Sequence, residues 1–99
     1  MNDKVLSLLG LMRKAGVLDV TEASCKQSVL SGKSKLILVA SDASETLIRR
    51  FSQRAACNNI QSVELKYSKV ELSNALGCNL CSVISINDSG FSEAIKKLL

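Results

Sequence analysis

Two of the four cysteines in this 99-residue sequence stand at a spacing that can support chemistry. Cys78 and Cys81 are separated by two residues, as in thiol redox motifs and zinc sites. A closed zinc site takes four ligands, but the sequence has no histidine, and Cys25 and Cys57 fall on helical positions where cysteine commonly packs as a small buried hydrophobe. Redox motifs of this type start a helix after a strand, whereas this pair enters a strand and should turn Cys81 toward the core. We therefore expect no metal site and rank a thiol enzyme last among the candidate functions.

The other reactive side chains lack the partners that catalysis needs. There is no histidine, no glycine-rich phosphate loop and no serine flanked by glycines, so the usual motifs of acyl transfer, nucleotide hydrolysis and dinucleotide binding are missing. Asp42 is the most suggestive acid because it follows an apolar strand, but an aspartate in this position usually caps or braces a turn. Thr21 and Glu22 are similarly typical of a helix start. The sequence therefore predicts a protein without catalytic activity.

The charge balance is mildly basic, with 13 Lys and Arg against 9 Asp and Glu and a formal net charge of +4. Such a bias is compatible with a polyanionic partner, but it is also common in soluble proteins that bind none. Arg49, Arg50 and Arg54 form a basic cluster. Because Glu45 precedes Arg49 by four residues, the cluster also fits an ordinary ion-paired, solvated helix face, which is the interpretation we favour.

The sequence shows no membrane or targeting signal. No stretch approaches the ~20 apolar residues of a membrane span, and the N-terminus has Asp3 and an amphipathic pattern where a signal peptide would have its apolar core. We therefore expect a cytoplasmic protein without membrane contact.

Asp42 must be positioned by the apolar run at residues 36–40. This run is continuous rather than alternating, which favours a central strand covered on both faces. Residues 41–44 then form a strand-to-helix turn, and Ser44 caps a helix that begins at Glu45. The turn should lie at a sheet edge, where open α/β folds keep their ligand sites.

Cap residues and helical apolar spacing predict five helices. The starts are marked by Asn2 or Asp3, Thr21, Ser44, Ser68 with Glu71 in a capping box, and a turn at 87–90. The first four ends are marked by Gly16, Gly32, Asn58 with Asn59, and Gly77. The inward face of the closing helix is expected to comprise Phe91, Ala94, Ile95 and Leu98.

Four strands are expected between these helices, at residues 17–20, 36–40, 62–66 and 80–86. The alternation predicts an α/β fold, a three-layer α/β/α sandwich with a mixed sheet of about four strands, in one domain over residues 1–99. Because consecutive elements pack side by side and run in opposite directions, the helix start at 21–24 should share one sheet edge with the turn at 42–44.

Five blocks stand in a specific order along the chain: Leu8-Leu9-Gly10-Leu11 with Ala15-Gly16, Gly32-Lys33-Ser34-Lys35-Leu36, Ser41-Asp42-Ala43-Ser44, Leu72 with Ala75-Leu76-Gly77, and Asp88-Ser89-Gly90-Phe91. Over about residues 8–98 they resemble the bacterial YlxQ type of the kink-turn RNA-binding ribosomal protein family, often named after large-subunit protein seven-A-e. The resemblance implies a non-catalytic, cofactor-free protein that binds structured RNA, with ribosomal RNA among the candidates and no DNA. It also implies a ribosomal or translation-related setting.

The resemblance further implies three RNA-binding segments: the start of the second helix, the turn after the following strand, and the loop entering the last strand. They comprise Thr21, Glu22, Ala23, Ser24, Lys26, Gln27, Asp42, Ser44, Gly77, Cys78, Asn79 and Leu80. A helix N-terminus offers free N–H groups to phosphates or base edges, and an apolar loop can pack on unpaired bases.

This sequence departs from the family motif at three positions. Thr21 and Ser73 stand where relatives usually have glycine, and Gln27 stands where they usually have lysine, with Lys26 one position earlier. The alternative interpretation is a protein-interaction or scaffold domain that keeps the fold but binds RNA weakly or not at all. That alternative expects an exposed apolar patch, whereas RNA binding expects a polar, positive edge with outward donors.

Overall fold

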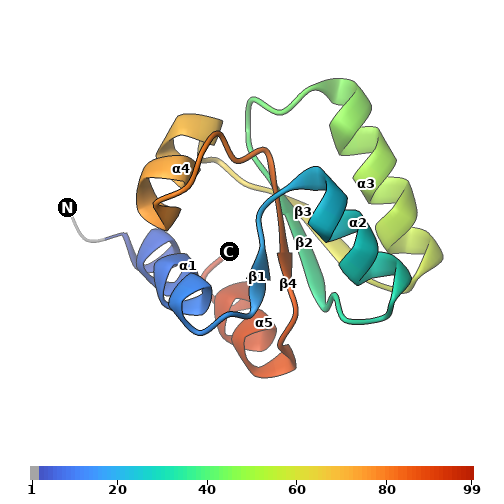
Figure 1. Ribbon diagram of the computed structural model, residues 1–99, viewed down its shortest axis with the longest axis horizontal. Helices are drawn as coiled ribbons and strands as arrows, with labels where there is room; N and C mark the ends of the chain where they lie inside the picture. The colour runs from blue at the N-terminus through green and yellow to red at the C-terminus, as the bar shows by residue number, and fades with distance from the viewer. Residues whose placement is uncertain (1–2) are drawn as a thin grey trace.

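The computed structural model describes residues 3–99, in which five helices alternate with four strands (Figure 1). The helices are α1 (Lys4–Lys14), α2 (Glu22–Leu30), α3 (Glu45–Cys57), α4 (Lys69–Leu76) and α5 (Ser89–Lys96). The strands are β1 (Leu18–Asp19), β2 (Leu36–Val39), β3 (Gln61–Glu64) and β4 (Val83–Ile86). None of these helices is both long and apolar enough to cross a membrane.

The four strands form one mixed sheet in the order β1-β4-β2-β3. β1 and β2 both pair antiparallel with β4, and β2 pairs parallel with β3. It follows that β1, β2 and β3 run in the same direction. The carboxyl ends of these three strands and the amino end of β4 therefore lie at one edge of the sheet.

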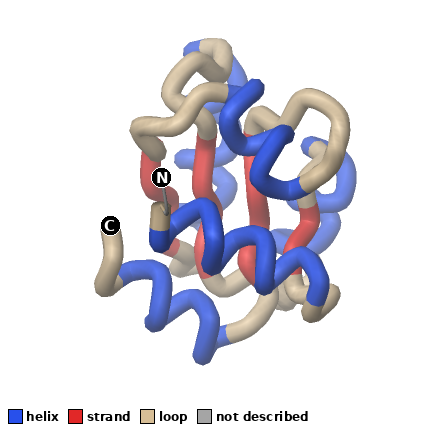
Figure 2. The backbone as a smooth tube through the Cα atoms, turned by 90° about the vertical axis from the view of Figure 1, so that its left-hand side faces the viewer, coloured by secondary structure: helices blue, strands red, loops and turns tan. Residues whose placement is uncertain are grey.

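Helices cover both faces of the sheet, which confirms the three-layer α/β/α sandwich. Figure 1 shows α2 and α3 on one side and α1, α4 and α5 on the other, and Figure 2 looks onto the latter group in front of the strands. All four residues of β2 are buried. Leu36 and Leu38 join the core under α1, α4 and α5, whereas Ile37 and Val39 join the core under α2 and α3. A continuous apolar run is therefore needed, because both faces of β2 are covered.

Local side-chain caps determine where the helices begin. Asp3 accepts hydrogen bonds from the N–H groups of Val5 and Leu6 at the start of α1, while the alternative cap Asn2 lies outside the described residues. The three predicted caps of α2, α3 and α4 are confirmed: Thr21, Ser44 and Ser68. Each cap takes up an N–H group that has no partner within its helix.

Strand boundaries differ from the predicted ones, most of all in β4. The sequence predicts a strand from residue 80, but β4 begins at Val83. The N–H of Cys81 bonds to the Ser73 side chain at 2.9 Å, and strand pairing of β2 with β4 begins at Val39 and Val83. β1 is shorter than predicted, and β3 spans residues 61–64 rather than 62–66.

The closing helix also begins earlier than predicted. Asp88 accepts a hydrogen bond from the N–H of Phe91, so α5 starts at Ser89, inside the predicted turn. Ile95 is buried and Phe91 is half-buried, but the expected inward residues Ala94 and Leu98 are exposed. Ser92 is buried instead, because it lies three residues before Ile95 and shares its helix face, while Leu98 lies beyond the end of α5.

Candidate nucleic-acid interface

The three predicted binding segments meet at one edge of the sheet. There β1 leads into α2, β2 leads into the turn before α3, and the chain returns from α4 to the start of β4. These connections lie together at the top of Figure 1. We call this region, comprising residues 20–27, 42–44 and 77–80, the candidate edge. The prediction that 21–24 and 42–44 share an edge is confirmed.

A surface hollow of about 500 Å³ joins two of these segments. Thr21 and residues 77–80 line it, together with Arg13 from α1 and Val20 from the end of β1. The turn 42–44 lies at the same edge but outside this hollow. The predicted site residues are exposed, except for Ser24 and Cys78, which are half-buried.

The start of α2 is held by a reciprocal cap between two hydroxyl side chains. Thr21 Oγ1 accepts a hydrogen bond from the N–H of Ser24 at 3.1 Å, and Ser24 Oγ accepts one from the N–H of Thr21 at 3.4 Å. No acceptor within residues 3–99 takes the N–H groups of Glu22 and Ala23, as expected for the first turn of a helix. These two N–H groups, at the positive end of the helix dipole, can bind an anion.

An ion pair between helices brings an arginine to this helix start. Arg50 of α3 lies 3.5 Å from Glu22, and both side chains are about half exposed, at 46% and 53%. The expected pair of Glu45 with Arg49 is not formed within residues 3–99. An exposed ion pair of this kind is weak, so Arg50 can exchange Glu22 for a phosphate.

Lys26 and Gln27 are both exposed one turn further along α2. Successive residues of a helix differ in direction by about 100°. The cation of Lys26 therefore faces a different direction from the Gln27 amide.

The polar side chains of the turn 42–44 are engaged in holding helices. Asp42 Oδ1 accepts a hydrogen bond of 2.8 Å from the N–H of Lys69, the first residue of α4. Ser44 Oγ accepts one of 3.2 Å from the N–H of Leu47 in α3. The sequence predicts that Asp42 accepts hydrogen bonds from backbone N–H groups of its own turn. This prediction is wrong, because the sheet places α4 beside the turn and the N–H group that Asp42 accepts from belongs to α4. The structural role of Asp42 as an acceptor of backbone N–H is confirmed.

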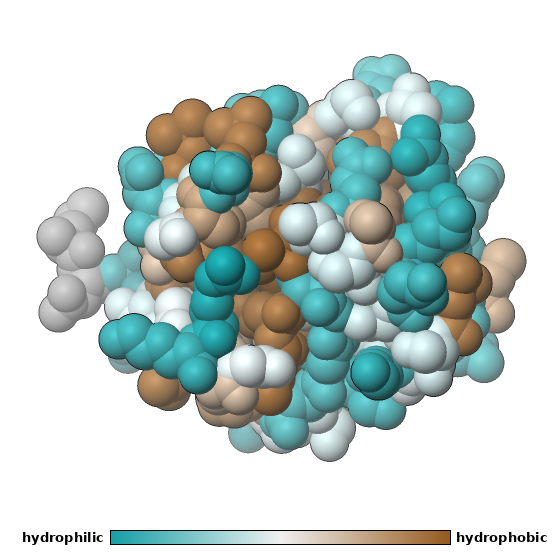
Figure 3. All heavy atoms as spheres, in the orientation of Figure 1, coloured by the Kyte–Doolittle hydropathy of each residue, from teal (hydrophilic) through white to brown (hydrophobic). Residues whose placement is uncertain are grey.

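The loop 77–80 adds an apolar element to the candidate edge. Gly77 ends α4 with φ +66°, a left-handed conformation that glycine adopts without strain. Leu80 is 63% exposed, and Val70 in α4 is 56% exposed. In Figure 3, hydrophobic side chains gather over α4 and its surroundings, while hydrophilic ones dominate over α2 and α3. The edge thus combines polar groups of α2 with one exposed apolar side chain, Leu80.

All four cysteines are free thiols, and burial differs among them. Cys81 is fully buried as predicted, and burial, together with the neighbouring Cys78, raises the pKa of its thiol to about 12. Burial likewise raises the pKa of Cys25. Such thiols stay protonated at neutral pH and are poor nucleophiles. Cys57 is exposed, contrary to the expectation that it is buried, because it is the last residue of α3 and lies off the helix face that carries Phe51.

Within residues 3–99, no three cysteine, aspartate or glutamate side chains come together in a way that could hold a metal ion. The sequence alone did not indicate two arginines that lie beside the candidate edge, Arg13 and Arg50. The cluster 49–54 pointed to basic character, but nothing in the spacing indicated that Arg50 meets Glu22 or that Arg13 approaches the loop 77–80.

Comparison with known proteins extends over nearly the whole chain. A protein of Enterococcus faecium named RNA-binding protein YlxQ is 29% identical over 96 residues, which are 97% of this chain and 91% of the relative. No protein-family model matches.

Solved structures share the fold, as two examples illustrate. A protein of unknown function from Bacillus halodurans superposes with a TM-score of 0.92 at 28% identity, covering 98% of this chain and 97% of the other. The 15.5kD RNA binding protein of Giardia lamblia superposes with a TM-score of 0.78 at 17% identity, covering 99% and 87%.

Proposed function

We propose that this protein is a non-catalytic RNA-binding protein that recognises structured RNA, a kink-turn or a related bent motif, in a ribosomal or translation-related setting. The observation that carries the proposal is the candidate edge, where an open helix N-terminus, the cation of Lys26 and the side chain of Leu80 face solvent together. Arg13 and Arg50 lie beside this edge. The name of the Enterococcus faecium relative supports RNA as the ligand.

Each part of the edge has a role in this proposal. The free N–H groups of Glu22 and Ala23 bind a phosphate oxygen or a base edge. Arg13, Lys26 and Arg50 supply positive charge to the RNA backbone. Kinked and looped RNA exposes unpaired bases, and an exposed aliphatic side chain in the loop 77–80 can pack on them. Asp42 and Ser44 contribute indirectly, by holding α4 and α3 around the edge.

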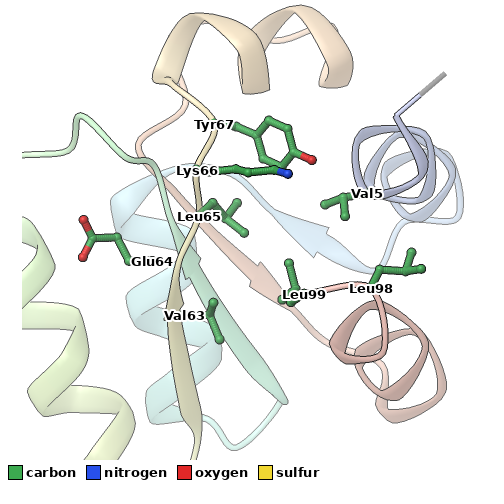
Figure 4. Close-up of a pocket in the computed structure, with 8 residues that line it drawn as sticks. All are labelled: Val5, Val63, Glu64, Leu65, Lys66, Tyr67, Leu98 and Leu99. Atoms are coloured by element: carbon green, nitrogen blue, oxygen red, sulfur yellow. The ribbon is translucent and has the colours of Figure 1, made fainter. Parts of the chain in front are cut away.

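A protein-interaction domain is the second candidate, because a partly apolar hollow of about 250 Å³ lies beside β3, one of the two edge strands of the sheet (Figure 4). Leu98 and Leu99 line it and are 43% and 48% exposed. Val5 of α1 lines it, as does Leu65, which follows the last residue of β3, while Glu64 points away. The two exposed leucines beside this hollow are what supports a scaffold function.

A binding titration separates the two functions. Purified protein is mixed with a fluorescent kink-turn RNA and with a straight RNA duplex of equal length, at several salt concentrations. RNA binding predicts tighter binding of the bent RNA and a linear fall of log affinity with log salt, by about 0.7–0.9 per phosphate contact. Equal affinity for both RNAs contradicts structured-RNA recognition, and absence of binding to either makes the interaction domain the better interpretation.

A further inference from the structure

Hydrogen bonds from the loop between α4 and β4 converge on one buried residue of α4, Ser73. The residue is only 8% exposed. Its carbonyl oxygen accepts hydrogen bonds from the N–H groups of Gly77 at 2.9 Å and Cys78 at 3.2 Å. Its hydroxyl accepts one from the N–H of Cys81 at 2.9 Å and donates toward the carbonyl oxygen of Asn79 at 3.0 Å. Four of the five residues at 77–81 are therefore tied to Ser73.

The contacts of the side chain require a hydroxyl. A serine hydroxyl has one hydrogen to donate and two lone pairs to accept with, so Ser73 can take the Cys81 N–H while donating to a carbonyl. The carbonyl oxygen of Lys69, one turn earlier in α4, lies 2.7 Å away and shares that hydrogen with Asn79. Cys81 is fully buried, so its N–H has no access to water if the hydroxyl is removed.

Leu80 is the one residue of this stretch whose backbone has no bond to Ser73, and its side chain is 63% exposed. The tethered neighbours Asn79 and Cys81 hold the backbone on either side of it. The Leu80 side chain is thereby presented to solvent at the candidate edge, in the hollow that it lines together with Arg13 and Thr21.

We propose that Ser73 is a positioning residue for RNA binding, which holds the loop 77–81 in the conformation that presents Leu80 to an unpaired base. This inference rests on the proposed RNA-binding function. Ser73 itself does not touch the RNA, because it is buried beneath the loop.

The test compares the full-length variants Ser73→Ala, Ser73→Thr, Leu80→Ala and the double variant Ser73→Ala/Leu80→Ala. Ser92→Ala is the matched control, since Ser92 is a buried serine on a different helix, at 2% exposure. Affinity for the kink-turn RNA, hydrogen exchange of the Cys81 amide and thermal melting are measured for each. Thermal melting identifies any variant that fails to fold. Leu80→Ala replaces an exposed side chain, so it still tests whether Leu80 contacts the RNA.

Ser73→Ala is expected to speed exchange of the Cys81 amide and to weaken RNA binding roughly tenfold. Ser73→Thr, which keeps the hydroxyl, is expected to restore both. Because Ser73 is proposed to act through Leu80, the double variant should lose little more than either single one.

Unchanged RNA affinity in a folded Ser73→Ala variant overturns the inference, as do strictly additive losses in the double variant. If the wild-type protein binds no RNA, the proposed function fails by itself. Hydrogen exchange of the Cys81 amide then still decides whether Ser73 holds the loop. An exchange rate in Ser73→Ala equal to that of the wild type shows that it does not.

Discussion

Asp42 and Lys69 are 27 residues apart in the chain, yet the Asp42 carboxylate accepts a 2.8 Å hydrogen bond from the Lys69 N–H. The bond fastens the turn after β2 to the first residue of α4. One side chain thus connects a segment of the candidate edge to α4, the helix that precedes the loop 77–80.

Asp42→Ala is expected to destabilise the protein by about 1 kcal/mol, as loss of a helix-capping acceptor does. Asp42→Asn, which keeps an oxygen acceptor, should recover most of this loss. Chemical denaturation of the three proteins measures the effect. Unchanged stability combined with loss of RNA binding would show that Asp42 contacts RNA directly.

Gln27→Lys is expected to strengthen kink-turn binding, because relatives of the resembled family usually carry a lysine at this position. One added phosphate contact should steepen the dependence of log affinity on log salt by roughly 0.7–0.9. Lys26→Ala, on a side chain about 100° away around α2, should have a smaller effect. A salt titration of the two variants and the wild type on one RNA tests this. No change in Gln27→Lys together with loss of binding in Lys26→Ala would mean that the motif is aligned one residue out of register.

Tyr67→Phe is expected to lower stability at neutral pH and to make stability less sensitive to acid. The Tyr67 hydroxyl donates a 2.6 Å hydrogen bond to Asp3 Oδ2, and this bond is the main cause that lowers the pKa of Asp3 below its ordinary value of 3.8. A lowered carboxyl pKa contributes stability that is present above pH 3.8 and is lost as the pH falls through the folded-state pKa. Denaturation at pH 7, 5, 3 and 2 should therefore show a difference between wild type and variant that shrinks below pH 4. A difference that stays constant across this range would rule out the ionised form of Asp3 as its source.

Chelators and mild reductants are expected to leave the melting temperature unchanged, because the four cysteines are free thiols and two of them are fully buried. Thermal melting with and without each reagent, together with elemental analysis of the purified protein, measures this. About one zinc per chain, with unfolding upon chelation, would contradict the prediction.

Much of the local structure was predictable because its signals lie within a few residues. The caps Thr21, Ser44 and Ser68 each accept a hydrogen bond from an N–H group three residues away. Their role as helix caps can therefore be predicted from short sequence spacings. The apolar run 36–40 likewise identifies a strand covered on both faces without reference to its neighbours. The sequence alone therefore determined the order of elements, the fold class and most helix starts.

The tertiary structure decided which groups meet across the chain. Because β4 lies between β1 and β2, the loop 77–80 comes beside Thr21, which no sequence spacing indicates. The Ser73 hydroxyl accepts a hydrogen bond from the N–H of Cys81, and β4 begins only at Val83. Arg50 forms an ion pair with Glu22 of α2, whereas the expected pair of Glu45 with Arg49 lay within α3. Hydrogen bonds and ion pairs depend on distances of a few ångströms, and those distances exist only after the sheet has brought remote segments together.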